Sequence, residues 1–195
     1  GTIVAAFRNL STTRVSYSTS SDATTWSTTL AVSSPAQGQG AHIQLNPATG
    51  SPAIAYYDRA NNVVNLASCS GTPASCATSG WSVSSIESAA GVSALVAGNE
   101  QVLRANLKFT STGVPYVIYP RGQGNDGKLV FTTNASGSLA STTMAESANA
   151  SLSGSPALNF AVSGWGVSSA LNAAGGLTSV YVGPGGWLYS TSCGD

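Results

Sequence analysis

The chain repeats itself at a spacing that is typical of stacked β-sheet units. Four segments align on Gly1, Gly50, Gly113 and Gly164, at intervals of 49, 63 and 51 residues. Two copies share more: residues 50–56 read Gly-Ser-Pro-Ala-Ile-Ala-Tyr, and residues 113–119 read Gly-Val-Pro-Tyr-Val-Ile-Tyr. This period is close to that of β-propeller blades. A unit of this size cannot bury its apolar face alone, so we expect the copies to pack on one another around a continuous core.

Each unit divides into short strands in which apolar residues recur at every second position, with turn residues between them. In the second unit these strands carry Ile43 and Leu45, then Ile54 and Tyr56, then Val64 and Leu66, and the last begins at Trp81. Four antiparallel strands per unit predict an all-β, β-propeller-like fold of about four blades. The units span approximately 1–32, 41–88, 103–146 and 156–193, within a single domain of residues 1–195.

The first unit lacks a counterpart of the first strand, so we expect its blade to be incomplete. A strand to complete it could come from residues 92–96 or from a neighbouring chain. On the same ground, the chain is expected to be a piece excised from a longer protein.

Aromatic residues recur at equivalent places, which favours packing rather than ligand binding. Trp26, Trp81 and Trp187 occupy one such place, at the start of the last strand of a unit, and Phe7, Tyr56 and Tyr119 occupy another. We expect all six in the core between units. An aromatic residue that breaks the repeat is the better candidate for a binding role.

The low charge of the chain excludes several classes of function. Only 7% of its residues are charged, with seven acidic and seven basic side chains, against about 25% in typical soluble domains. No net positive charge is available to attract phosphates, which argues against nucleic-acid binding. No apolar run reaches the roughly 18 to 20 residues that span a bilayer, and we expect no membrane insertion.

The three cysteines predict a single disulfide. Cys69 and Cys76 flank a six-residue loop that suits the end of a clipped hairpin, and a disulfide implies an oxidising compartment. Cys193 is left over, either as a buried thiol or as one that has lost its partner. With His42 as the only histidine, a metal site is not expected.

Residues 50–58, Gly-Ser-Pro-Ala-Ile-Ala-Tyr-Tyr-Asp, followed by Asn61-Asn62, the Cys69/Cys76 hairpin and Trp81, resemble a blade repeat of bacterial secreted and surface β-propeller proteins. The resemblance is close in 41–88, partial in 103–146, and reduced to spacing in the other two units. It implies a secreted or cell-surface location. Residues 20–26, Ser-Ser-Asp-Ala-Thr-Thr-Trp, are similar to a degenerate Asp-box, in which Asp22 would cap the backbone of its own hairpin.

The candidate ligand-binding residues come from loops and from departures from the repeat. Trp165 lies in a turn where the other copies have Ser51 or Val114, and Tyr57 should point away from Tyr56 by strand alternation. Asp58 follows Tyr57, and three arginines fall at the start of the same inter-strand loop in three copies, which are Arg8, Arg59 and Arg121.

No catalytic constellation is recognisable in the sequence. A glycosidase needs two positioned carboxylates, whereas the seven acids are scattered singly, and nothing predicts a cofactor. We therefore predict a non-catalytic, adhesin-like or lectin-like recognition module that binds a cell-surface glycan or another surface ligand, such as the tip of a fibre.

Two alternatives are a reduced glycosidase or sialidase-like enzyme, which would use Asp58 or Glu100 with the arginines, and a structural oligomerisation domain. An incomplete blade leaves an open sheet edge, and self-association, with a closed homotrimer favoured, would cover it.

Overall fold

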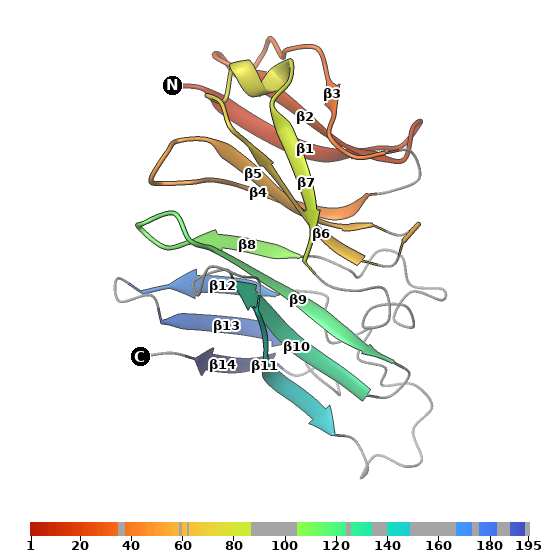
Figure 1. Cartoon of the computed structure of the whole chain (residues 1–195), viewed down its shortest axis with the longest axis vertical. Helices are drawn as coiled ribbons and strands as arrows, with labels where there is room; N and C mark the ends of the chain where they lie inside the picture. The colour runs from red at the N-terminus through yellow and green to blue at the C-terminus, as the bar shows by residue number, and fades with distance from the viewer. Residues whose placement is uncertain are drawn as a thin grey trace.

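The computed structural model describes residues 1–34, 38–58, 60–61, 63–86, 105–123, 126–133, 140–148, 167–172, 176–182 and 188–193. Within these ranges the protein is all-β and forms four antiparallel sheets (Figure 1). Each sheet is built from strands that follow one another along the chain. The all-β prediction is therefore confirmed.

The four sheets follow the four sequence units. Sheet 1 contains β1 (Ile3–Asn9), β2 (Arg14–Ser20) and β3 (Leu30–Ala31). Sheet 2 contains β4 (Gln39–Leu45), β5 (Pro52–Asp58), β6 (Val63–Cys69) and β7 (Trp81–Ser85), with the short 3-10 helix η1 (Ser75–Ala77) before β7. Sheet 3 contains β8 (Asn106–Phe109), β9 (Pro115–Gln123), β10 (Asp126–Thr133) and β11 (Ala140–Ala148). Sheet 4 contains β12 (Ser168–Leu171), β13 (Leu177–Val182) and β14 (Leu188–Cys193).

The described sheets pack in chain order without closing into a ring. The first strands of neighbouring sheets lie against one another, β1 on β4, β4 on β8 and β8 on β12. In the described part of the chain, sheet 1 has no strand in the place that β4 and β8 occupy in their sheets, since β1 aligns with β5 in the repeat. Residues 92–96, one expected source of such a strand, lie outside the described residues.

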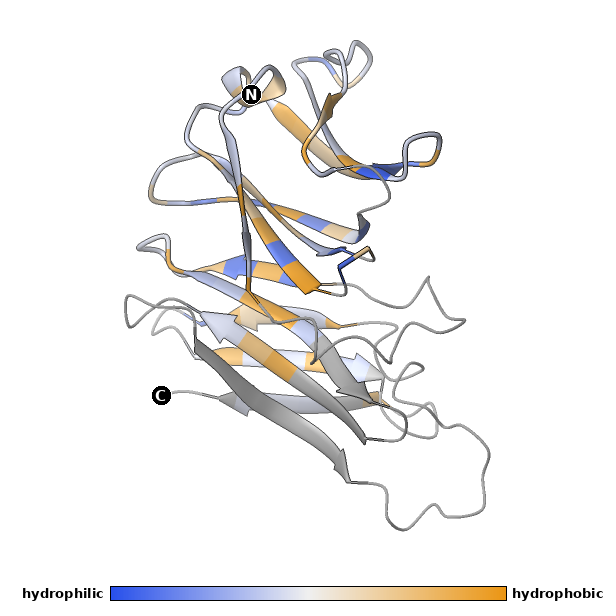
Figure 2. Cartoon of the chain, turned by 45° about the vertical axis from the view of Figure 1, so that its right-hand side comes forward, coloured by the Kyte–Doolittle hydropathy of each residue, from blue (hydrophilic) through white to orange (hydrophobic). Residues whose placement is uncertain are grey.

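The central strands β5 and β6 of sheet 2 are buried on both faces, because sheets 1 and 3 cover them from opposite sides. One apolar cluster joins Val15 and Tyr17 of sheet 1 to Ile54 and Tyr56 of β5. A second cluster contains Tyr57 and extends through sheet 3 into sheet 4. Every residue of β5 is buried. Figure 2 shows the corresponding hydrophobic colouring along the strands in the middle of the molecule.

The aromatic residues divide into buried and exposed groups, which corrects part of the sequence prediction. Tyr56 and Tyr119 are each 1% exposed, as expected, and Trp81 packs partly buried against the cluster between sheets 1 and 2. Phe7 and Trp26 are instead 39% and 42% exposed, so the prediction that they are core residues is wrong. Both belong to sheet 1, which no described sheet covers on its outer side. Trp187 lies outside the described residues.

The predicted start of the last strand is correct at Trp81, which begins β7. In sheet 1, Trp26 makes only an isolated bridge with Ser20, and β3 begins four residues later at Leu30. β14 begins at Leu188, directly after Trp187, where the repeat predicted the start of that strand.

Two glycines at equivalent repeat positions have left-handed backbone, with φ of 72° at Gly50 and 85° at Gly113. Side chains are strained at such angles. A Cβ atom at Gly113 would in addition lie 2.5 Å from Asn46 Oδ1 and 2.9 Å from the Ala48 Cβ atom, whereas one at Gly50 would meet nothing within 4 Å.

We expect Gly113→Ala to destabilise the protein by more than Gly50→Ala, because only the first also pushes the β8–β9 turn off the β4–β5 turn. The strain common to both is of order 1 kcal/mol, and the difference between them measures the contact between the two turns. Urea unfolding of both variants tests this. Equal losses of stability would contradict the contact.

Candidate functional site

A groove of about 460 Å³ lies between sheets 2 and 3, where β5 and β9 begin. Six polar residues line it, which are Asn46, Thr49, Ser51, Ser68, Ser70 and Ser84. Leu66, Phe109 and the two equivalent prolines Pro52 and Pro115 supply apolar surface. None of the described residues that line it is charged. Its volume is within the roughly 300 to 1,000 Å³ of ligand sites.

Two turns at one end of the groove hold each other in place through Asn46. The Asn46 side chain donates from Nδ2 to the Gly113 carbonyl oxygen at 3.3 Å, and its Oδ1 accepts from the Ala48 N–H at 2.9 Å. In the second turn, the Val114 N–H donates to Thr110 Oγ1 at 3.0 Å. These hydrogen bonds fix the conformation of the two short turns at this end of the groove.

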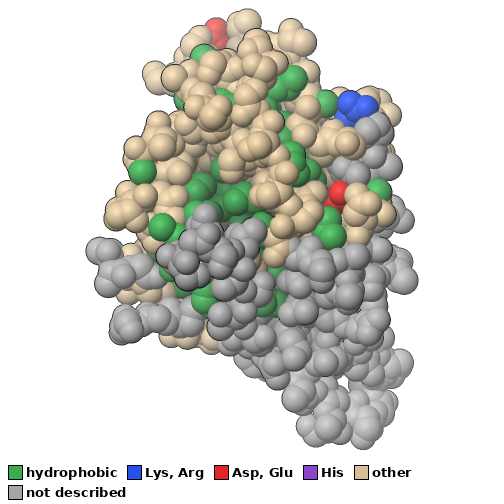
Figure 3. Space-filling model, viewed as in Figure 1, with side chains coloured by type: hydrophobic (Ala, Val, Ile, Leu, Met, Phe, Trp, Pro, Cys, Tyr) green, Lys and Arg blue, Asp and Glu red, His purple; other side chains and the backbone are tan. Residues whose placement is uncertain are grey.

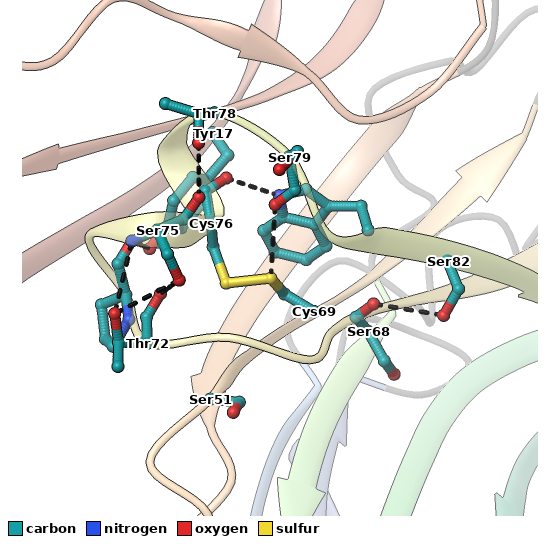
Figure 4. The surroundings of a disulfide bond; sticks show 12 residues. Tyr17, Ser51, Ser68, Cys69, Thr72, Ser75, Cys76, Thr78, Ser79 and Ser82 are labelled. Atoms are coloured by element: carbon teal, nitrogen blue, oxygen red, sulfur yellow. Dashed lines mark hydrogen bonds between the residues drawn. A yellow bond between two sulfur atoms is a disulfide. The ribbon is translucent and has the colours of Figure 1, made fainter.

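The disulfide forms another part of the groove wall. Cys69 lines the groove and is bonded to Cys76, so the predicted disulfide is confirmed. Figure 4 shows this bond beneath η1, with Tyr17 and a neighbouring indole ring close to it. The Tyr17 hydroxyl donates to the Pro73 carbonyl at 2.9 Å, and Trp81 Nε1 donates to the Cys76 carbonyl at 2.9 Å.

The disulfide itself is buried, although most residues of the loop that it clips are exposed. Cys76 is 0% exposed and Cys69 is 6% exposed. The rings of Tyr17 and Trp81 meet edge to face, with centroids 5.1 Å apart, and burial raises the pKa of Tyr17 to about 12. The disulfide is therefore part of the core between sheets 1 and 2, whereas Thr72, Ala74 and Ser75 of its loop are exposed.

A second hollow, of about 320 Å³, shares Phe109 with the groove and lies beside sheet 4. Its lining includes Gln44, Leu45, Ser169 and Lys108, which supplies its one charge among the described lining residues. Phe109 is thus the apolar side chain common to both hollows. On the face drawn in Figure 3, apolar side chains gather in the middle, while the visible acidic and basic groups lie at the margins of the coloured region.

His42 links sheet 2 to sheet 3 close to these hollows. Its Nδ1 accepts a hydrogen bond from the Leu107 N–H at 3.1 Å. Burial, with a further contribution from the Lys108 charge, lowers the pKa of His42 below its ordinary value of 6.5. The neutral imidazole is the form that can accept this bond, so Nδ1 of His42 forms a structural link between the two sheets.

We expect the stability to decrease in mild acid through His42. The unfolded chain binds a proton near pH 6.5 and the folded chain only at lower pH, so the unfolded state holds more protons in that window. The full contribution is present above about pH 6.5 and is lost as the pH falls through the folded pKa. The loss should be about 1 kcal/mol, as for one hydrogen bond.

The measurement is the free energy of unfolding from pH 5 to pH 8 for the parent and for His42→Asn. The variant should be less stable above pH 6.5 and should lack this dependence. If the free energy of unfolding of the parent increased as the pH falls, the lowered pKa assigned to His42 would be contradicted.

Asp58, a predicted ligand-binding residue, stabilises the β5–β6 turn through hydrogen bonds. Its Oδ1 accepts from the Ala60 and Asn61 N–H groups at 3.0 and 3.2 Å, and its Oδ2 accepts from Asn61 Nδ2 at 2.8 Å. Asn65 bridges Asp58 Oδ2 and the Tyr56 hydroxyl at 3.4 and 3.3 Å. Asp58 is 2% exposed, so its carboxylate is occupied by the β5–β6 turn.

The other predicted site residues are not brought together in the described part of the chain. Tyr57 is 1% exposed and faces away from Tyr56 into the cluster that reaches sheets 3 and 4. Its ring therefore offers no surface to a ligand. Trp165 and Arg59 lie outside the described residues.

Arg8 and Arg121 lie within β1 and β9 rather than in loops, which corrects the prediction that they begin a loop. Arg8 Nε is buried and has no hydrogen-bond partner among the described groups. Both strands carry these arginines near their carboxyl ends, as β5 carries Asp58 at its end. The groove opens at the amino ends of β5 and β9, so it is a different site from the predicted one.

The Asp22 turn has the structural role expected of it. Asp22 Oδ1 accepts from the Thr24 and Thr25 N–H groups at 2.8 and 2.7 Å and from Ser20 Oγ at 3.0 Å. These bonds hold the pKa of Asp22 well below its usual range. The carboxylate caps its own turn.

The described residues include no group of three or more His, Cys, Asp and Glu side chains placed to hold a metal ion. Among the same residues, no helix is long and apolar enough to cross a membrane. Comparison with protein-family models and with curated proteins finds no match for this chain.

Sequence reasoning did not identify the groove, although one signal for it was present. The repeat aligns residues 50–52 with 113–115, which places Ser51 and Pro52 at the same level as Val114 and Pro115. Equivalent turns of adjacent sheets lie side by side when the sheets stack. The groove lies between these two turns, and residues of both line it.

Proposed function

We propose that the protein is a non-catalytic, extracellular recognition module that binds a neutral, hydroxyl-rich ligand in the groove between sheets 2 and 3. The observation that carries this proposal is the lining of the groove, which combines uncharged hydroxyl and amide groups with Phe109. Sugars are recognised by such groups, because hydroxyls pair with hydroxyl and amide side chains while aromatic rings contact the sugar C–H face.

The four sheets are, in this proposal, the blades of a β-propeller-like module. The support is that each repeat unit gives one antiparallel sheet and that first strands of successive sheets lie together. The Cys69–Cys76 disulfide is compatible with an extracellular location. We propose cell-surface glycans as the ligand class. The module would bind them as an adhesin-like or lectin-like tip of a fibre.

The enzymatic alternative loses its nearest candidate in the described structure, because Asp58 is buried and engaged in a turn. Glu100, the other candidate, lies outside the described residues. Turnover of a fluorogenic sugar panel, abolished by Asp58→Asn in a folded variant, would favour that alternative over ours.

The test of the binding proposal is a neutral-glycan array probed with the labelled chain and with Ser84→Trp. Ser84 is exposed on β7 and lines the groove, so the indole should fill the groove and reduce binding at least tenfold without loss of stability. Val83→Trp is the matched control. Val83 precedes Ser84 on β7, so its side chain points to the opposite face of the strand.

Equal effects of the two tryptophans on binding, or no binding by the parent chain, would contradict this site. Thermal unfolding of all three proteins establishes that the comparison is between folded chains. Binding that persists in Ser84→Trp and is lost in Val83→Trp would move the ligand to the other face of β7.

A further inference from the structure

The carboxyl ends of the first strands of sheets 2, 3 and 4 meet at the second hollow, the one of about 320 Å³. Gln44 and Leu45 end β4, Lys108 and Phe109 end β8, and residues 169–171 end β12. All of them line the hollow. It therefore lies where three successive units come together, next to the groove of the proposed function, with which it shares Phe109.

Lys108 faces sheet 4 from β8. Asn106 lies two residues earlier, on the same side of the strand, and its Nδ2 donates to the Val167 carbonyl oxygen at 3.3 Å. Val167 directly precedes β12, so this bond ties the beginnings of the two strands together. The Lys108 side chain follows along the same side of β8, where β12 lines the hollow with residues 169–171.

Gln44 brings a second polar side chain to the hollow from β4. By strand alternation it lies on the same side of β4 as His42. His42 Nδ1 accepts a hydrogen bond from the Leu107 N–H of β8, so this side of β4 faces sheet 3. Gln44 and Lys108 thus reach one hollow from two first strands that contact each other.

The polar groups of both side chains are available to a ligand. Neither Lys108 nor Gln44 has a side-chain hydrogen bond or an ion pair with the described residues. Ser169, the third polar lining residue, instead pairs its hydroxyl with Ser179 Oγ at 2.8 Å. None of the described lining residues is acidic, so none of them neutralises the Lys108 charge. An ammonium and an amide N–H are both donors, and a carboxylate has two oxygens to accept from them.

We propose that the second hollow binds the carboxylate of an acidic sugar, while a neutral part of the same glycan occupies the groove. In this arrangement Lys108 Nζ and the Gln44 amide donate to the carboxylate oxygens, and the Phe109 ring, common to both hollows, contacts the sugar C–H groups between the two sites. The inference rests on the proposed function, and it adds to the neutral ligand of the groove one negative charge beside it.

The test is an array of matched pairs, each a neutral glycan and the same glycan capped with glucuronic acid or with sialic acid. The parent should bind at least one capped glycan about fivefold more tightly than its neutral partner, as for a charge-assisted contact that solvent partly screens. Lys108→Met should bind both members of that pair equally, whereas Lys108→Arg should keep the preference because it keeps the charge. The two kinds of cap distinguish the two sources of the carboxylate.

Arg14→Gln is the control for net charge, because it removes a positive charge from sheet 1 and Arg14 lines neither hollow. It should keep the preference for the capped glycan, and loss of the preference in this variant would assign it to net charge instead of Lys108. If Lys108→Met does not fold, Gln44→Leu gives a second variant, which should weaken the same preference.

The outcomes separate this inference from the proposed function. If neutral glycans bind and no capped glycan binds more tightly, the carboxylate site is overturned and the groove proposal stands. A preference that persists in Lys108→Met overturns the carboxylate site as well. If the folded parent binds no glycan of either kind, both proposals fail. Ser84→Trp should weaken binding of both members of a pair, since the neutral part of each occupies the groove.

Discussion

Replacement of Tyr57 by alanine is expected to lower the free energy of unfolding by about 3 to 5 kcal/mol, the usual cost of truncating a large buried aromatic side chain. Tyr57 is 1% exposed and belongs to the cluster that contains Val64, Leu107 and Leu177. The cavity would lie where sheets 2, 3 and 4 share one core, so the loss should affect the cooperative unfolding of all three.

Urea unfolding followed by tryptophan fluorescence measures this loss. Val83→Ala is the control, because Val83 is 46% exposed on β7 and should change stability by no more than about 0.5 kcal/mol. Tyr57→Ala could instead be as stable as the parent and fail to bind a ligand. That result would support the ligand-binding prediction for Tyr57 and contradict its buried position in the core.

Loss of the Cys69–Cys76 disulfide is expected to cost about 2 to 3 kcal/mol by the chain-entropy model for a short loop. Cysteine-to-alanine substitution should cost more than this, since Cys76 is fully buried between sheets 1 and 2 and the change removes packing as well as the crosslink. Because Tyr17 and Trp81 lie against this loop, their near-ultraviolet circular dichroism should weaken as well.

Thiol counting in denaturant is the first measurement, and it should find one free thiol among the three cysteines of the chain. Three free thiols would refute the disulfide. Urea unfolding of the oxidised and reduced protein then gives the stability difference. A loss confined to the stability, with unchanged dichroism from Tyr17 and Trp81, would contradict the packing of the loop on sheet 1.

The prediction of the strands was accurate where local chemistry decides the outcome. Alternating apolar residues and turn residues identified β5 and β6, and the aligned glycines Gly50 and Gly113 both have the positive φ that makes glycine the suitable residue. A two-residue period is a property of an extended chain, and a left-handed turn residue is a local requirement. Neither depends on the rest of the fold.

The candidate site was not predictable in the same way. Alternation correctly placed Tyr57 opposite Tyr56, but the sequence pattern could not show that a third sheet covers that side. The reverse holds for Phe7 and Trp26, which match buried positions of other units yet lie on an end sheet. Burial depends on which neighbours a strand acquires, and equivalent residues of a repeat differ when one unit lies at the end of a stack.

The sequence by itself determined the all-β class, the division into four units, the capping role of Asp22 and the Cys69–Cys76 pairing, because each follows from spacing or from contacts within a few residues. Only the tertiary structure decided which faces are covered and that Phe109 borders a groove between two sheets. Those features arise where different sheets meet, and the way whole sheets pack sets which residues come together there.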